Sequence, residues 1–310
     1  MLIYIIKKIL SFLLILLLLS LISISIIYYA PHSPFENLSL LDAYDVFYHQ
    51  FILNQFSFAN HTMWEIIAQI VLPTFELAIL AIICSIMIGF PIGIFAGLTH
   101  SNKTNHFIKF VCLVLYASPI IWLAVLVMFM LSTDWIFTRN TSYQPIANSL
   151  SLLDVALTPS IDKLTILMNE IKHLLIPVMI LTIQPCIITI QLVSQRVNVT
   201  AHQNYIKVAS IRENSSLKVL FRHLLPNAIP KTIPQLTYNI TTLLFSTMAI
   251  EILLNRSGLG TWLFWAFHQQ DYTIIAVAIF SCGALVSLLT LLSEIIVVMV
   301  YPVQSRALYE

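Results

Sequence analysis

Residues 202–228 read His-Gln-Asn-Tyr-Ile-Lys-Val-Ala-Ser-Ile-Arg-Glu-Asn-Ser-Ser-Leu-Lys-Val-Leu-Phe-Arg-His-Leu-Leu-Pro-Asn-Ala, and this stretch decides how the chain is interpreted. It separates two apolar segments, and with Arg196 just upstream it holds five of the fifteen Lys and Arg residues. Its second half has apolar side chains at helical spacing, with Lys218 and Arg222 off that stripe. The stripe comprises Leu217, Leu220, Phe221, Leu224 and Leu225. A basic amphipathic helix of this kind either lies on lipid headgroups or docks on a cytoplasmic partner, and the pattern alone leaves both open.

The composition identifies an all-α integral membrane protein. Apolar residues make up 59% of the chain, charged residues 9%, and the mean hydropathy is +0.90. A soluble domain carries about 25% charged residues. The net charge of +1, without a basic tail, predicts membrane lipid as the surroundings and no nucleic-acid partner. The four cysteines lie inside apolar blocks without ligand spacing, so we expect no disulfide and no metal site.

Six apolar blocks are long enough to cross a bilayer as helices. They cover residues 9–29, 75–98, 107–131, 173–194, 232–254 and 273–301. We therefore expect six transmembrane helices, the first retained because no small-residue cleavage site follows it. The suggested organisation is a first helix plus periplasmic loop over 1–74, and a core of five helices over 75–310. A cytoplasmic loop over 196–231 belongs to that core.

The distribution of Lys and Arg predicts the orientation. With the N-terminus inside, the inner segments hold eleven of these residues and the outer segments four, which together account for all fifteen. Both termini and the 196–231 loop are then cytoplasmic. The long outer loops are acidic. This is typical of a solvated surface, and it also suits attraction of a cationic substrate.

Several residues within or next to the apolar blocks carry specific expectations. Gly89, Gly93 and Gly97 recur every four residues, which predicts a helix face that a neighbouring helix approaches closely. Glu76, Glu251 and Asp271 are candidate pathway or gating residues, because ionisable groups in spans usually face a cavity or a partner. For Glu76 an interfacial position is an equal alternative.

The sequence contains no recognisable enzyme motif, neither a phosphate-binding loop nor a nucleophile or metal-protease signature. We therefore expect no catalytic residues, and ATP hydrolysis, if used, must come from another chain. A self-sufficient channel or secondary transporter is an alternative class. It would show charged relays or two related halves, and no internal repeat is evident.

Short motifs in a fixed order resemble the permeases of bacterial ABC importers of the dipeptide and oligopeptide class. The Pro-His-x-Pro sequence after the first block resembles the Sap branch of that class. The motifs are Ala30-Pro31-His32-Ser33-Pro34, Pro73-Thr74-Phe75-Glu76-Leu77, His173-Leu174-Leu175-Ile176-Pro177, Gln203-Asn204-Tyr205-Ile206-Lys207, His223-Leu224-Leu225-Pro226-Asn227-Ala228, Gly258-Leu259-Gly260 and Gln269-Gln270-Asp271-Tyr272.

The resemblance implies a MetI-like permease fold and several partners. These are a second, homologous permease, two ATPase subunits that bind ATP and magnesium, and a periplasmic substrate-binding protein, all of the Sap type. This chain itself would bind no cofactor. The implied role is peptide uptake linked to cationic antimicrobial peptides, with polyamine (putrescine) export as an alternative.

The 202–228 stretch would be the loop that couples the permease to an ATPase. Leu217, Phe221 and Leu224 would insert into the ATPase, while Lys218 and Arg222 fix the orientation. The full set of candidate coupling residues is Tyr205, Ala209, Glu213, Asn214, Leu217, Phe221, Arg222 and His223.

One departure from the class concerns the turn in this loop. The class has glycine where this chain has Glu213, so we expect the turn at Asn214, a residue that tolerates positive φ. Ser215 would then cap the following helix.

Overall fold

The computed structural model describes residues 2–31, 39–52, 57–58, 61–99, 102–130, 163–213 and 215–300. Its helices are α1 (Leu2–Tyr28), α2 (Leu40–Ile52), α3 (Met63–Leu98), α4 (Asn102–Ala117), α5 (Ile120–Met130), α8 (Lys163–Ala201), α9 (Asn204–Arg212), α10 (Ser216–Val219), α11 (Leu225–Ala228), α12 (Ile233–Leu253), α13 (Leu259–Gln269) and α14 (Tyr272–Val300). A π-helical turn, Leu220–Leu224, joins α10 to α11, and a 3-10 turn, Ile229–Thr232, leads into α12. The strands β1 (Ser57–Phe58) and β2 (His61–Thr62) form a small antiparallel pair.

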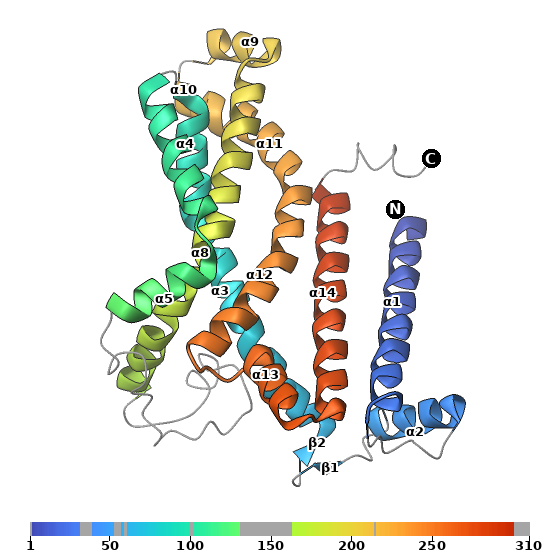
Figure 1. Cartoon of the computed structure of the whole chain (residues 1–310). Helices are drawn as coiled ribbons and strands as arrows, with labels where there is room; N and C mark the ends of the chain where they lie inside the picture. The colour runs from blue at the N-terminus through green and yellow to red at the C-terminus, as the bar shows by residue number, and fades with distance from the viewer. Residues whose placement is uncertain are drawn as a thin grey trace.

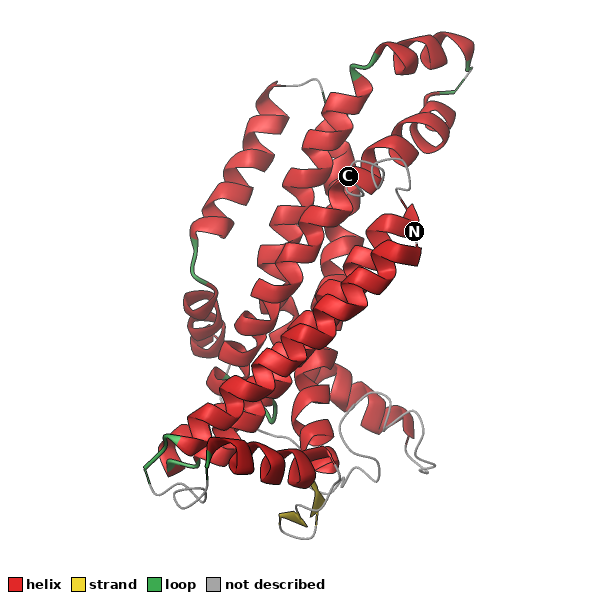
Figure 2. Cartoon of the chain, turned by 90° about the vertical axis from the view of Figure 1, so that its right-hand side faces the viewer, coloured by secondary structure: helices red, strands yellow, loops and turns green. Residues whose placement is uncertain are grey.

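The helices form an elongated bundle with two distinct ends (Figure 1). The α9–α10 segment lies at one end, and the start of α1 and the end of α14 point towards that end without reaching it. At the opposite end lie α2, the two short strands and α13. The same separation is seen after a quarter turn (Figure 2). A structure with all long helices running between two ends is what a bilayer requires, since each helix satisfies its own backbone hydrogen bonds.

The centre of the bundle is the pair α3 and α8, which has the most extensive contact of any two helices described. The three glycines of α3 face α8 at successive turns. A Cβ on Gly89 would lie 2.9 Å from Thr189, on Gly93 2.8 Å from Val193, and on Gly97 2.7 Å from Val197. The four-residue spacing thus places the backbones of these two helices close together, as the sequence led us to expect.

The predicted count of six spanning helices is not exactly confirmed among the described residues. Among the described residues, four helices are long and apolar enough to cross a membrane: Tyr4–Tyr28, Ile70–Leu98, Glu170–Ala201 and Ile274–Ile296. Counting α4 and α5 as one broken span gives five. The remaining predicted span, 232–254, corresponds to α12, a helix of 21 residues, of which the apolar part among the described residues is Asn239–Leu253.

The predicted third span, 107–131, is broken rather than straight. The segments His106–Ala117 and Ile120–Met130 meet at 89°. Pro119 lies at the break. It has no N–H to continue α4, and its ring disfavours helical geometry at Ser118. Its carbonyl instead accepts the first hydrogen bonds of α5, from the N–H groups of Trp122 (3.0 Å) and Leu123 (3.2 Å).

The outer loops contain helices that the hydropathy pattern did not reveal. The predicted loop 30–74 includes α2. Ser39 caps the start of this helix, because its hydroxyl oxygen accepts a hydrogen bond of 3.2 Å from the Asp42 N–H. The predicted loop also includes the first twelve residues of α3, which runs on through residues 74–75, where the sequence suggested a division. A further helix, α13, lies between α12 and α14.

The first helix packs mainly along the last one. Figure 1 shows α1 beside α14, and Ile24 and Ile27 of α1 form a buried cluster with Ala276 and Val277 of α14. At the other end of this contact, Lys8 Nζ lies 2.8 Å from Glu294 Oε1. Most of α1 otherwise exposes leucine and isoleucine side chains, as a lipid-facing helix does.

Candidate functional site

Residues 202–231, here called the hairpin, are fixed to the bundle by an apolar cluster. Val193 and Val197 of α8 pack with Ile206 of α9, Val219 of α10 and Leu224 of the π turn, all of them buried. Phe90 and Ile94 of α3 and Ala209 of α9 join the edge of the same cluster. Residues 196–201, which we expected in the loop, still belong to α8. The hairpin is therefore a rigid extension of the α3–α8 pair.

The hairpin exposes several large apolar side chains beside its basic residues. Five large side chains are more than 45% exposed: Tyr205 (47%), Val208 (64%), Ile211 (86%), Leu217 (66%) and Phe221 (67%). They come from both arms of the hairpin, α9 and α10 with its π turn. We call this set the exposed face. Exposed clusters of this kind mark a surface that another protein or a lipid covers.

One expectation for the stripe was wrong. Leu224 was expected to insert into a partner together with Leu217 and Phe221, but only 3% of it is exposed and it packs inside the bundle. The cause is the π turn, in which the Leu225 N–H bonds to the Leu220 carbonyl, five residues back. This wider turn rotates residues after Phe221 towards α8, so a stripe that looks continuous at 3.6 residues per turn is divided between two faces.

The Glu213 carboxylate links the two arms of the hairpin through contacts with basic side chains. Its Oε1 lies 3.6 Å from Nη1 of Arg222 and 3.5 Å from Nε2 of His223. Its backbone is extended, with φ −96° and ψ 130°, so the position itself has no left-handed turn. Asn214, to which we assigned the turn, lies outside the described residues. Ser215 does occupy the position before α10, but its side chain makes no capping hydrogen bond, contrary to expectation.

A second polar cluster lies towards the opposite end, where α12 meets α13. Glu251 of α12 is fully buried, and its Oε2 accepts a hydrogen bond of 2.9 Å from the Gly260 N–H. Thr74 of α3, 1% exposed, accepts a 2.9 Å hydrogen bond from the Leu259 N–H through its hydroxyl. The first N–H groups of α13 have no partner within their own helix, and Gly258 before them has no side chain to supply one. The caps come instead from two other helices.

Close approach explains the glycines of this segment. A Cβ on Gly258 would collide with the Glu251 carboxylate, and one on Gly260 would collide with the Met248 carbonyl. The turn leaving α12 is made by Asn255 at φ 48°. The N–H of Arg256 bonds to the Glu251 carbonyl at 2.9 Å and that of Asn255 to the Ile252 carbonyl at 3.3 Å, the pattern of a Schellman motif.

Two of the three candidate gating residues, Glu76 and Glu251, are each linked to Arg256, whereas Asp271 caps a helix. Glu76 of α3 is buried and lies 4.0 Å from Nη2 of Arg256, the residue whose N–H bonds to Glu251. Asp271 instead begins α14, since its Oδ1 accepts a 3.1 Å hydrogen bond from the Ile274 N–H. Asp271 therefore has a structural role as a helix cap, and its place in a pathway stays a prediction.

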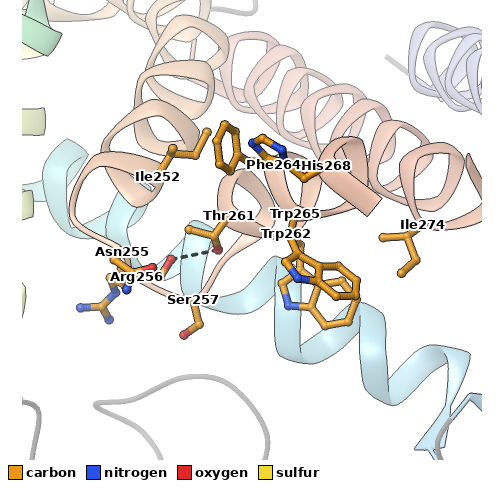
Figure 3. A pocket seen from close by; sticks show the side chains of 10 residues that line it. All are labelled: Ile252, Asn255, Arg256, Ser257, Thr261, Trp262, Phe264, Trp265, His268 and Ile274. Atoms are coloured by element: carbon orange, nitrogen blue, oxygen red, sulfur yellow. Dashed lines mark hydrogen bonds between the residues drawn. The ribbon is translucent and has the colours of Figure 1, made fainter. Parts of the chain in front are cut away.

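A cavity of about 750 Å³ opens beside this cluster (Figure 3). Trp262 and Trp265 lie close together on one side of it and Phe264 and His268 on another. Its remaining walls include Asn255, Arg256 and Ser257. The volume is in the range of small-molecule sites.

Sequence reasoning singled out Glu251 but not Thr74 and Arg256, which lie in the same cluster, or Trp262, which lines the cavity. A signal was present for the backbone donor to Glu251. A buried carboxylate needs donors, and the glycines seven and nine residues after Glu251 mark the place where a backbone comes close enough to provide one. Nothing in the sequence marks Trp262 and Trp265 as cavity residues.

Taken together, a bundle of long apolar helices with an anchored hairpin at one end defines a multi-pass membrane protein. Residues 89–305 match the family of binding-protein-dependent transport system inner membrane components, and this chain belongs to that family. It is therefore a multi-pass inner-membrane protein.

Similar proteins extend over the whole chain. A peptide transport system permease protein SapB of Salmonella typhimurium is 30% identical, covering 100% of this chain and 99% of the relative. A putrescine export system permease protein SapB of Escherichia coli K12 has the same identity and coverage. A dipeptide transport system permease protein DppB of Escherichia coli K12 is 22% identical over 77% of this chain and 73% of its own.

A solved structure confirms the fold class. The MetNI methionine ABC transporter in an inward-facing conformation contains a chain that superimposes with a TM-score of 0.56, covering 77% of this chain and 97% of its own. At 15% identity this similarity concerns the fold alone. The expectation of a MetI-like permease fold is confirmed, and four to five of the six expected spans are found among the described residues.

Proposed function

We propose that this chain is the permease subunit of an ATP-driven transporter for peptides, and that its hairpin docks on an ATPase. Membership of the family supports the transport role, and the names of the SapB and DppB relatives support peptides as the substrate class. The observation that carries the docking is the exposed face on a rigidly anchored hairpin. A force applied to such an element passes to α3 and α8 rather than bending a loop.

The proposed assembly contains a second permease, two ATPases and a periplasmic binding protein. ATP and magnesium would be bound by the ATPases, and this chain would bind no cofactor. The hairpin end would face the cytoplasm, with both termini on that side. Ten of the described Lys and Arg residues belong to the start of α1, to α4 or to the segment from the end of α8 to the turn before α12, whereas Lys163, Lys172 and Arg256 belong to the start of α8 and the turn after α12. The ten are Lys7, Lys8, Lys103, Lys109, Arg196, Lys207, Arg212, Lys218, Arg222 and Lys231.

The docking is tested by Leu217→Asp and Phe221→Asp in the full complex. Each variant replaces an apolar side chain that would be buried against the ATPase with a charged one. The affinity of the permease for the ATPase should therefore fall more than about tenfold. Ser216→Asp, an exposed position one residue away, is the matched control, since it adds the same charge off the exposed face. Co-purification in detergent and ATP turnover in vesicles are the measurements. Unchanged ATPase binding by both face variants would reject the docking.

Putrescine is a second candidate substrate because one relative is named for its export. Asp42 and Asp45 of α2 are exposed at the end away from the hairpin, and an acidic surface there suits a cationic peptide and a polyamine alike. Reconstituted complex, oriented in vesicles, separates the two. Peptides added with the binding protein should stimulate ATP hydrolysis if the chain serves uptake, and putrescine should stimulate it from the hairpin side if the chain serves export.

A further inference from the structure

We propose that Thr74 and Glu251 are positioning residues for transport, because they hold the N-terminus of α13 to α3 and α12 and so make α13 follow the movements of the hairpin. This inference rests on the proposed function, since it concerns how motion at the ATPase reaches the far end of the chain. It concerns residues that do not contact the hairpin or the ATPase.

The first step is that α13 is held by its neighbours rather than by its own sequence. Its N-cap residue is Gly258, and the N–H groups of Leu259 and Gly260 are satisfied by Thr74 of α3 and Glu251 of α12. All of these groups are buried. An N–H left unpaired at such a site is costly, because water does not replace the lost acceptor. Moving α13 away from α3 therefore breaks a hydrogen bond that nothing else on the helix replaces.

The second step is that α3 connects this clamp to the hairpin. Thr74 and Phe90 belong to the same helix, and Phe90 packs at the edge of the hairpin cluster. Gly89, just before Phe90, and Gly93 and Gly97, after it, bring α3 into close contact with α8. Helix α8 carries Val193 and Val197, which belong to the same hairpin cluster. At 1.5 Å per residue, the sixteen-residue separation of Thr74 and Phe90 corresponds to about 24 Å along the helix. Displacement of the hairpin thus displaces the helix that bears one of the two caps.

The third step is that the helix held by Thr74 and Glu251, α13, is the one that lines the cavity. Thr261, Trp262, Phe264, Trp265 and His268 of α13 form much of its wall. Figure 3 shows these side chains projecting from the turns that follow Gly258. Apolar contacts of Leu259 and Trp262 with Ile70 and Val71 of α3 support the same attachment. The cavity wall is consequently tied to α3, while Glu251 ties it to α12.

The test uses isosteric and conservative variants of the two acceptors. Thr74→Val and Glu251→Met remove the acceptor at similar volume, whereas Thr74→Ser and Glu251→Gln keep an oxygen that accepts from the same N–H. Each of the four variants is studied in the complete transporter with its ATPases, and each also carries a reporter cysteine in place of Gln269. This residue is exposed at the end of α13 and lies outside the cavity. A membrane-impermeant maleimide reports its accessibility with and without ATP. A chain without the reporter gives the background of the four native cysteines.

We expect ATP to change the labelling rate at position 269 about threefold or more in the wild-type background and in the two conservative variants. In Thr74→Val and Glu251→Met this response should disappear, and substrate moved per ATP hydrolysed should fall about tenfold, while ATPase binding and basal hydrolysis persist. Conservative rescue separates the loss of the hydrogen bond from general misfolding, because all four variants alter the same two buried sites.

Three results would overturn the inference. They are a normal ATP response in Thr74→Val and Glu251→Met, equal failure of all four variants, and no response at position 269 in a wild-type complex that binds ATPase and transports. Failure of the wild-type chain to bind an ATPase would instead reject the proposed function, and the inference with it.

Discussion

At the scale of single residues, this chain uses glycine for contact and other residues for turns. All six glycines lie in the described part of the chain, and none has a positive φ. Each marks a site where a Cβ would meet a neighbouring segment closer than real Cβ atoms come. The left-handed turns that end α12 and α13 are made by Asn255 (φ 48°) and Gln270 (φ 55°). A substitution at a glycine is therefore a test of packing rather than of backbone freedom.

Gly97→Ala is predicted to destabilise the protein. The added methyl would lie 2.7 Å from Val197 Cγ1 and 2.8 Å from the Ser194 carbonyl, which belongs to a helix backbone and cannot turn aside. Overpacking of this kind costs about 1–3 kcal/mol. A fall of a few degrees in Tm, measured by differential scanning fluorimetry in detergent, is the expected result.

Gly283→Ala is the matched control for that prediction. Its methyl would also meet an atom at 2.7 Å, but that atom is Cδ1 of Leu19, the end of a flexible side chain. We expect a smaller change in Tm, because the leucine changes its rotamer. Equal effects of the two substitutions would show that the α3–α8 contact is looser than the structure indicates.

The sequence predicted part of this residue-level structure. The four-residue repeat of glycine is visible in the sequence, and it predicted that this face of α3 packs closely against another helix, which the structure identifies as α8. The turns at Asn255 and Gln270 were not visible, because no glycine marks them and Gln is an uncommon residue at positive φ. The caps on α13 were not visible either, since Thr74 and Leu259 are 185 residues apart in sequence.

At the scale of elements, periodicity identified helices but not their breaks. The stripe of residues 217–225 is a correct sign of an amphipathic helix, yet the π turn divides it, so Leu217 and Phe221 face outward and Leu224 faces α8. The block 107–131 is continuous in hydropathy, and only Pro119 inside it indicates that it bends. Helices α2 and α13 were missed because their lengths and polar residues resemble loops in a hydropathy profile.

Pro119→Ala is predicted to release the bend between α4 and α5. The substitution supplies an N–H that continues α4, so a straighter form becomes accessible. Spin labels at Phe107 and Phe129, both exposed, would be about 22 Å apart in the right-angled form and about 33 Å apart in a continuous helix. The measurement is pulsed electron–electron double resonance in nanodiscs, with the four native cysteines replaced. It should show a new, longer distance between the labels at positions 107 and 129.

Pro91→Ala serves as the control, because Pro91 lies inside α3 and away from the bend. It should leave the 107–129 distance unchanged. A single short distance in Pro119→Ala would mean that the packing of Ile120 and Ala124, both buried in the core, fixes the bend without the proline.

At the scale of the whole molecule, the chain consists of a rigid centre and a peripheral first helix. The α3–α8 pair joins the hairpin, α12 and α13, whereas α1 packs chiefly on α14 and α2. The fold class and its membrane location followed from composition alone. The number of crossings did not, because an apolar run says neither where a helix bends nor how far it extends into a loop. Family resemblance supplied the fold that the hydropathy pattern could not.

The attachment of α1 leads to a prediction about charge. Lys8 and Glu294 form a 2.8 Å ion pair, each side chain 33% exposed. Lys8→Glu or Glu294→Lys alone places like charges together, and each should lower stability by up to about 1 kcal/mol. The double swap restores opposite charges and should recover most of the loss, whereas Lys7→Glu, the same change at the preceding exposed residue, should have little effect. Scanning fluorimetry at low and moderate salt measures the cycle. If the two single losses simply add in the double variant, the pair does not hold α1 to α14, and the apolar cluster of Ile24 and Ile27 with Ala276 is what retains the first helix.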